Sequence, residues 1–79
     1  MKIGLRMPKL GATMDEGKIV GWHVKPGDRV SPGDVVCEVE SDKAVLDVES
    51  AWEATVEEIL VEEGQTVPIG TVMANFRKD

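Results

Sequence analysis

Glycine and proline recur along this chain at short intervals, and this spacing constrains the fold more than any other feature. The turn-forming segments read MPKLG, EGK, KPGD, SPGD, EEGQ and VPIG. Between them lie short runs rich in valine, isoleucine and leucine, namely KIVGWHV, DVVCEVE, AVLDVE, TVEEILV and TVMANF. Short apolar runs bounded by turn residues are typical of the strands of a β-sandwich or barrel. Since no segment shows sustained helical periodicity with caps, the sequence predicts an all-β fold.

The two halves of the chain share one pattern. A shift of 37 positions, which is the distance from Gly27 to Gly64, also superimposes Gly33 on Gly70. The same shift pairs apolar residues: Ile19 with Val56, Trp22 with Ile59, Val24 with Val61, Val30 with Val67, Val35 with Val72, Cys37 with Ala74 and Val39 with Phe76. This repeat predicts two similar small sheets, related by approximate two-fold symmetry, that face each other across one core.

Alternation along the predicted strands assigns side chains to two faces, because successive residues of a strand point to opposite sides of the sheet. The inward set is predicted to be Val20, Trp22, Val24, Val35, Cys37, Val39, Ala44, Leu46, Val48, Val72, Ala74 and Phe76. Four acidic residues are predicted to point outward, namely Glu38, Glu40, Asp47 and Glu49. Met7 and Met14 bracket a loop, and we expect them to fill gaps in the core because methionine adapts to irregular spaces.

The length of the chain limits what this fold can contain. Residues 1–79 are predicted to form one domain, which at this size buries only about 60% of the surface that the unfolded chain exposes. No apolar run approaches the roughly 20 residues of a membrane helix, so we expect a soluble protein that does not bind membranes. The single cysteine, Cys37, forms no internal disulfide, which suits a reducing compartment.

Charge is unevenly distributed along the chain. The net charge is −6, and residues 1–34 carry six basic and four acidic side chains. Residues 35–76 carry ten acidic side chains and one basic side chain, Lys43. Such an acidic region repels phosphate backbones, so the sequence argues against nucleic-acid binding and favours a partner with a basic docking surface. The same acidic residues equally suit a plain solvated face.

Lys43 lies in the segment SDKA, between two predicted strands. Asp42 and Lys43 are predicted to form the centre of a tight hairpin turn, because aspartate favours turns by accepting backbone hydrogen bonds. The positive φ of the most favoured two-residue hairpins does not suit this pair, which indicates a type I turn. A lysine at a protruding tip lacks the apolar pocket that activates a nucleophile. It therefore suits either modification by another enzyme or an ordinary place on the surface.

The whole chain resembles the lipoyl domain of the acyltransferase subunit in 2-oxo-acid dehydrogenase complexes. The matching segments are MPKLGATMDEGKIVGWHVKPGD, SPGDVVCEVESDKA and ATVEEILVEEGQTVPIGTVMANF. The resemblance implies a flattened barrel of two four-stranded antiparallel sheets, with the lysine at the tip of one hairpin. It also implies that Lys43 carries lipoate in amide linkage. Glu40, Ser41, Asp42 and Ala44 are then the residues that a modifying enzyme or another partner recognises.

The resemblance further implies a carrier that catalyses no reaction itself. A lipoate ligase or lipoyl transferase attaches the lipoyl arm. The arm then accepts an acyl group at the 2-oxo-acid dehydrogenase component, delivers it to coenzyme A at the acyltransferase core and is reoxidised by dihydrolipoamide dehydrogenase. A tethered arm visits these active sites at high effective concentration.

The resemblance also indicates the type of complex and the longer protein to which the domain belongs. The opening MPKLG favours a complex of the pyruvate or acetoin type, and we expect the 79 residues to be a domain of a longer acyltransferase. The isolated domain is expected to be a monomer. We expect it in the bacterial or archaeal cytoplasm in preference to the mitochondrial matrix.

Three alternatives remain at this point. Biotinyl domains share the expected fold but commonly flank their lysine with methionine, where this chain has Asp42 and Ala44. The lipoyl carrier of glycine cleavage is similar but typically longer. The third alternative is an interaction module whose lysine is never modified.

The segment after the hairpin departs from the lipoyl family, which commonly has proline at the positions of Glu49 and Ala51 and glycine at that of Ala54.

His23 and Cys37 lack the neighbouring residues that a metal or catalytic site requires. His23 is the only histidine, and alternation after Trp22 turns it outward. Cys37 is predicted to be a small core residue with a suppressed thiol reactivity, because apolar surroundings raise the pKa of a thiol. One histidine and one inward cysteine provide neither a zinc site nor a catalytic triad.

Overall fold

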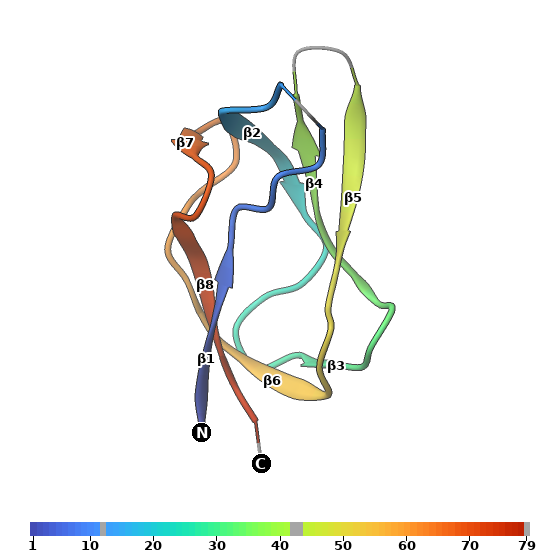
Figure 1. The fold of residues 1–79 in the computed structure, drawn as a ribbon. Helices are drawn as coiled ribbons and strands as arrows, with labels where there is room; N and C mark the ends of the chain where they lie inside the picture. Colours follow the sequence, from blue (N-terminus) through green and yellow to red (C-terminus); the bar gives the residue numbers. More distant parts are fainter. Residues whose placement is uncertain (12, 42–43, 79) are drawn as a thin grey trace.

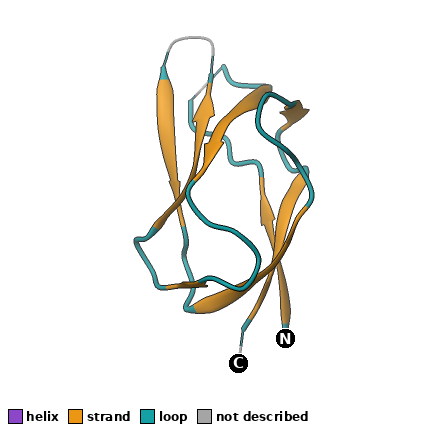
Figure 2. Ribbon diagram, turned by 180° about the vertical axis from the view of Figure 1, so that it is seen from behind, coloured by secondary structure: helices purple, strands orange, loops and turns teal. Residues whose placement is uncertain are grey.

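The computed structural model describes residues 1–11, 13–41 and 44–78. It contains eight strands: β1 (Lys2–Arg6), β2 (Glu16–Trp22), β3 (Arg29–Val30), β4 (Val35–Glu40), β5 (Val45–Glu49), β6 (Ala54–Ile59), β7 (Thr66–Pro68) and β8 (Val72–Arg77). Within these ranges every regular element is a strand (Figure 2). In the same part of the chain, no helix has the length and apolar character needed to cross a membrane. The predicted all-β class is confirmed.

Two four-stranded antiparallel sheets form the domain, with strand orders β1-β8-β6-β3 and β5-β4-β2-β7 (Figure 1). The 37-residue shift carries β2, β3 and β4 onto β6, β7 and β8, so it also carries one sheet order onto the other. The short strand β3 pairs with β6, and the short strand β7 pairs with β2. Each half of the chain therefore completes the sheet of the other half, and the predicted two-fold symmetry is confirmed.

Hydrogen bonds and backbone angles at the two equivalent turns repeat this symmetry. The Gly27 amide donates to the Val56 carbonyl at 2.8 Å, and the Gly64 amide donates to the Ile19 carbonyl at the same distance. Both glycines have positive φ, 98° for Gly27 and 88° for Gly64. Because side-chain-bearing residues rarely adopt this conformation, the turn that leads into each exchanged strand requires glycine.

The core lies between the two sheets. Its fully buried side chains include Phe76, Met73, Ile19, Val30, Val36, Val39, Val56 and Cys37, and the loop residues Met7 and Met14 are also buried. Both methionines therefore fill core space, as predicted. Trp22 and Val24 are half-buried against this cluster. Most of the predicted inward set is confirmed.

The prediction for Val20 is wrong, because the sequence does not reveal β-bulges. Ile19 pairs with Val39 and Gly21 with Glu38, so Val20 is an extra residue in β2 and lies 43% exposed. A bulge adds one residue to one strand and interrupts the alternation of faces. The prediction applied the alternation of faces to Val20 as in a regular strand.

Two further bulges, at equivalent positions of β4 and β8, each add one buried residue that alternation did not predict. Val36 is extra in β4, since Val35 pairs with Glu49 and Cys37 with Val48. Its symmetry mate Met73 is extra in β8. Both side chains are fully buried, whereas Val35 and Val72 are only half-buried.

The inward prediction for Ala44 is also wrong. Ala44 is exposed, because β5 begins only at Val45 and Ala44 lies in the hairpin connection beyond the sheet. Leu46 and Val48, which follow it with the expected spacing, are half-buried and buried. The alternation was correct within the strand and failed where it was extended past the strand end.

The domain is elongated, with extents of 35 × 20 × 18 Å. The ends of β4 and β5 that face the hairpin connection lie at one extremity, and the chain ends near β1 and β8 lie at the other (Figure 1). We call these two extremities the hairpin pole and the termini pole.

Gly17 is tightly enclosed below the hairpin pole. A Cβ atom at this position would lie 2.6 Å from Cγ1 of Val39, 2.7 Å from Sδ of Met7 and 2.8 Å from Cε of Met14. We expect Gly17→Ala to lower the free energy of unfolding by about 1–3 kcal/mol through overpacking. Gly21→Ala is the control in the same strand, because its Cβ meets nothing closer than Glu63 Oε1 at 3.8 Å. Equal urea midpoints for the two variants would contradict this account of the packing.

Burial raises the pKa of Cys37 to about 12, and the nearby charge of Glu38 adds to this effect. In the unfolded chain a thiol ionises near pH 8.5, so between about pH 8.5 and 12 only the unfolded state loses the proton. We therefore expect the free energy of unfolding to fall as pH rises through this window, by at most about 1.4 kcal/mol per pH unit. Urea unfolding at several pH values tests this, with Cys37→Ala as the control. A variant with the same pH slope as the parent would show that Cys37 contributes nothing.

Candidate functional site

The β4–β5 hairpin joins Glu40 to Val45 at the hairpin pole. Glu40 and Val45 are paired in the ladder, so the connection consists of residues 41–44, as the sequence predicted. Asp42 and Lys43 lie outside the described residues, and the predicted type I turn and tip position of Lys43 stay predictions. The residues on either side of them are described.

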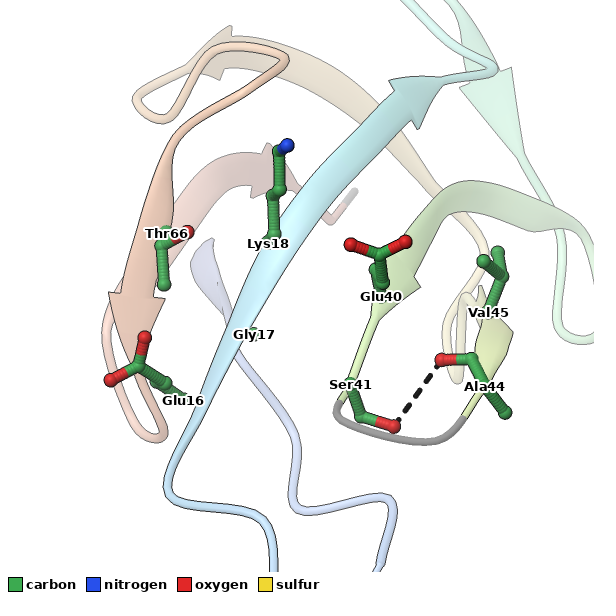
Figure 3. A pocket seen from close by; sticks show the side chains of 8 residues that line it. All are labelled: Glu16, Gly17, Lys18, Glu40, Ser41, Ala44, Val45 and Thr66. Carbon is green, nitrogen blue, oxygen red and sulfur yellow. Dashed lines mark hydrogen bonds between the residues drawn. The ribbon is translucent and has the colours of Figure 1, made fainter.

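Ser41 and Ala44 close the base of this connection. The Ser41 amide donates a hydrogen bond to the Ala44 carbonyl at 2.9 Å. The Ser41 hydroxyl donates to the same carbonyl oxygen at 3.2 Å (Figure 3). Two donors from one residue thus hold the hairpin together immediately before and after Asp42 and Lys43. The recognition role predicted for Ser41 stays a prediction, and the hydrogen bonds give Ser41 a local structural role.

The β1–β2 loop supports the hairpin from below. Met7 and Met14, at its two ends, are 1% and 5% exposed and pack towards Gly17 and Val39. The Leu10 amide contacts the Met14 sulfur at 3.3 Å. Because Val39 precedes Glu40 directly, this packing anchors the last residues of β4 to the core.

A groove of about 610 Å³ lies beside the hairpin on the outer face of the β5-β4-β2-β7 sheet (Figure 3). Its lining comes from four strands and the hairpin connection: Glu16, Gly17, Lys18, Glu40, Ser41, Ala44, Val45 and Thr66. Sequence reasoning identified Glu40, Ser41 and Ala44 but missed Lys18 and Thr66. The β2–β4 pairing places Lys18 beside Glu40, and the β2–β7 pairing places Thr66 beside Lys18; nothing in the local sequence indicates either pairing.

The outer face of β4 and β5 carries the acidic residues that alternation predicted. Glu40, Asp47 and Glu49 are exposed, and Glu38 is half-buried. Glu38 and Asp47 lie directly opposite each other in the ladder. Like charges at such positions repel, so this pair does not serve the stability of the sheet.

His23 is exposed, as predicted, and follows directly after the end of β2. Its Nε2 atom lies 3.3 Å from Oε2 of Glu38. The described residues contain no group of three or more metal-ligating side chains. Cys37 is a buried free thiol in the core, as predicted. None of these groups forms a catalytic constellation with the hairpin.

Known proteins share both the sequence and the architecture of this domain. A family model described as "Biotin-requiring enzyme" (Biotin_lipoyl) matches residues 4–76. The dihydrolipoyllysine-residue acetyltransferase component of the pyruvate dehydrogenase complex from Rickettsia bellii is 43% identical over 75 residues, which is 94% of this chain. Its counterpart from Staphylococcus aureus is 42% identical over 76 residues, or 96% of the chain. The chain covers 18% of the length of each of these two relatives.

A solved structure agrees with this result. The lipoyl domain of the 2-oxoglutarate dehydrogenase complex from Azotobacter vinelandii superimposes with a TM-score of 0.78 at 28% identity, covering 96% of both chains. The two four-stranded sheets and the expected resemblance to lipoyl domains of acyltransferase subunits are thereby confirmed. Since the family model spans nearly all of the sequence, the chain belongs to the family of biotinyl and lipoyl domains.

Proposed function

We propose that this chain is a lipoyl carrier domain in which lipoate is joined in amide linkage to Lys43. The observation that carries the proposal is the hairpin between Glu40 and Val45, closed by Ser41 and Ala44, in a chain that is 42–43% identical to acetyltransferase components named for a lipoyl-lysine residue. Sequence position puts Lys43 between these two closing residues.

The surroundings of the hairpin fit an attached arm. Ala44 and Val45 are exposed, so one flank of the hairpin is open to another enzyme. We assign the chemistry to partner enzymes and the carrying of the arm to this domain. When bound, lipoate supplies a disulfide that accepts an acyl group together with two electrons. The contribution of this chain is to hold the attachment point away from the core and to present it to several active sites at high effective concentration.

The partners follow from this role. We propose that a lipoate ligase or lipoyl transferase modifies Lys43, and that the modified domain serves a 2-oxo-acid dehydrogenase, an acyltransferase core and dihydrolipoamide dehydrogenase. The names of the relatives favour a pyruvate complex over an acetoin complex. The acidic outer face of β4 and β5 suits docking against basic active-site entrances. The cytoplasm is the proposed location.

Biotin attachment is the second candidate, because the matching family model is described by its biotin-dependent members. Lipoate is favoured for two reasons. The relatives are acetyltransferase components named for a dihydrolipoyllysine residue, and the superimposed structure is a lipoyl domain. The residues beside Lys43 are Asp42 and Ala44, where biotinyl domains commonly have methionine.

Replacement of the proposed attachment residue tests the assignment. We expect Lys43→Gln to abolish the mass increase caused by a lipoate ligase, because glutamine has no amine with which to form the amide. The thermal midpoint should stay close to that of the parent, since surface substitutions usually change stability by no more than about 0.5 kcal/mol. Lys25→Gln, at an exposed position in a turn, is the control and should be modified like the parent. A lipoyl adduct on the folded Lys43→Gln variant would refute the assignment.

A further inference from the structure

The strand ladders at the two poles of the domain are equivalent, but their side chains differ, and only the hairpin pole has a connection between its two outer strands. At the hairpin pole, one row of cross-strand neighbours runs Val45–Glu40–Lys18–Thr66 over the whole β5-β4-β2-β7 sheet. At the termini pole, the equivalent row runs Lys2–Arg77–Thr55–Arg29 over the β1-β8-β6-β3 sheet. The 37-residue shift relates Lys18 to Thr55 and Glu40 to Arg77, and it relates Arg29 to Thr66.

The charges of the two rows differ. The hairpin-pole row has one acidic and one basic residue, and Glu16 adds a second carboxylate to the groove. The termini-pole row has three basic residues, of which Lys2 lies 3.9 Å from Glu58 and Arg29 lies 3.5 Å from Glu53. The hairpin connection itself already marks one pole, and the charges beside it add a second difference. The side chains of these rows distinguish one pole from the other.

Lys18 and Thr66 are available for such recognition. Both side chains are exposed. In the described part of the chain, the Lys18 ammonium forms no ion pair within 4.0 Å, and it extends away from Glu16 and Glu40 (Figure 3). Three separate charges, two negative and one positive, thus line a groove that also offers the Thr66 hydroxyl. This pattern fits a polar partner segment that carries both a cation and a hydrogen-bond acceptor.

Distance from the attachment point decides which partner uses this groove. The enzyme that forms the amide must bring its active site to the amine of Lys43, so its surface must lie against the residues beside the hairpin. Enzymes that act on the far end of the attached arm need not bring their active sites to the hairpin, because the arm spans that distance. The groove shares Glu40, Ser41 and Ala44 with the hairpin, which places it in reach of the enzyme that forms the amide.

We propose that this groove is the surface by which the lipoate-attaching enzyme recognises the domain, and that Lys18 and Thr66 are specificity-determining residues far in sequence from SDKA. This inference rests on the proposed lipoyl function. The enzyme contributes a polar segment whose cation faces Glu16 and Glu40 and whose carboxylate or carbonyl group faces Lys18. Lys18 and Thr66 take no part in amide formation itself.

The symmetry of the domain supplies a matched pair of variants. Lys18→Thr with Thr66→Arg transfers two residues of the termini-pole row to the hairpin pole. Thr55→Lys with Arg29→Thr makes the reverse transfer at the other pole and serves as the control. Each double variant keeps the parent net charge of −6, because each gains and loses one basic residue. All four positions are at least partly exposed in strands, so both variants should fold.

The measurement is the initial rate of lipoyl attachment by a purified lipoate ligase with ATP and lipoate, followed by intact mass. We expect kcat/KM to fall about tenfold in the hairpin-pole variant, which corresponds to about 1.4 kcal/mol, and to change less than about twofold in the control. Thermal melts of both variants test the fold, and Lys18→Thr alone replaces the double variant if Thr66→Arg prevents folding.

The outcomes separate this inference from the function on which it rests. A parent domain that receives no lipoyl group overturns the proposed function and the inference together. A parent that is modified at the same rate as the hairpin-pole variant overturns the inference alone. Equal losses in both double variants also overturn it, because the effect would then not depend on the groove.

Discussion

Each half of this chain completes the sheet of the other half, and the remaining structure depends on that exchange. The short strands β3 and β7 cross to β6 and β2, and the Gly27–Val56 and Gly64–Ile19 hydrogen bonds close the two crossings. Neither half buries its apolar face without the other. A chain too short for a large core thus obtains one cooperative unit, in which both sheets share the side chains around Phe76 and Ile19.

This rigid frame explains how one hairpin can be held apart from the core. Val39, Gly17 and the two loop methionines fix the end of β4, and Ser41 joins the two sides of the connection through the Ala44 carbonyl. A carrier requires a fixed base and an accessible attachment point, and the arrangement of these residues suits both needs.

Sequence reasoning predicted the fold class, the two-fold repeat and most of the core, because glycine turns and valine alternation are local signals. It failed at Val20, Val36 and Ala44 for two physical reasons. A bulge adds a residue without any change in the hydrophobic pattern, and the end of a strand depends on its pairing partner. The groove was missed because Lys18 and Thr66 meet only through a long-range pairing, whereas SDKA lies in one continuous segment.

The identity of the group on Lys43 is decided by offering the domain both candidate ligases. The parent domain is incubated in parallel with lipoate ligase, ATP and lipoate, and with biotin ligase, ATP and biotin, followed by intact mass and peptide mapping. We expect one lipoyl adduct, located on Lys43, and no biotin adduct. A biotin adduct on Lys43 without a lipoyl adduct would contradict it, as would a folded domain that neither enzyme modifies.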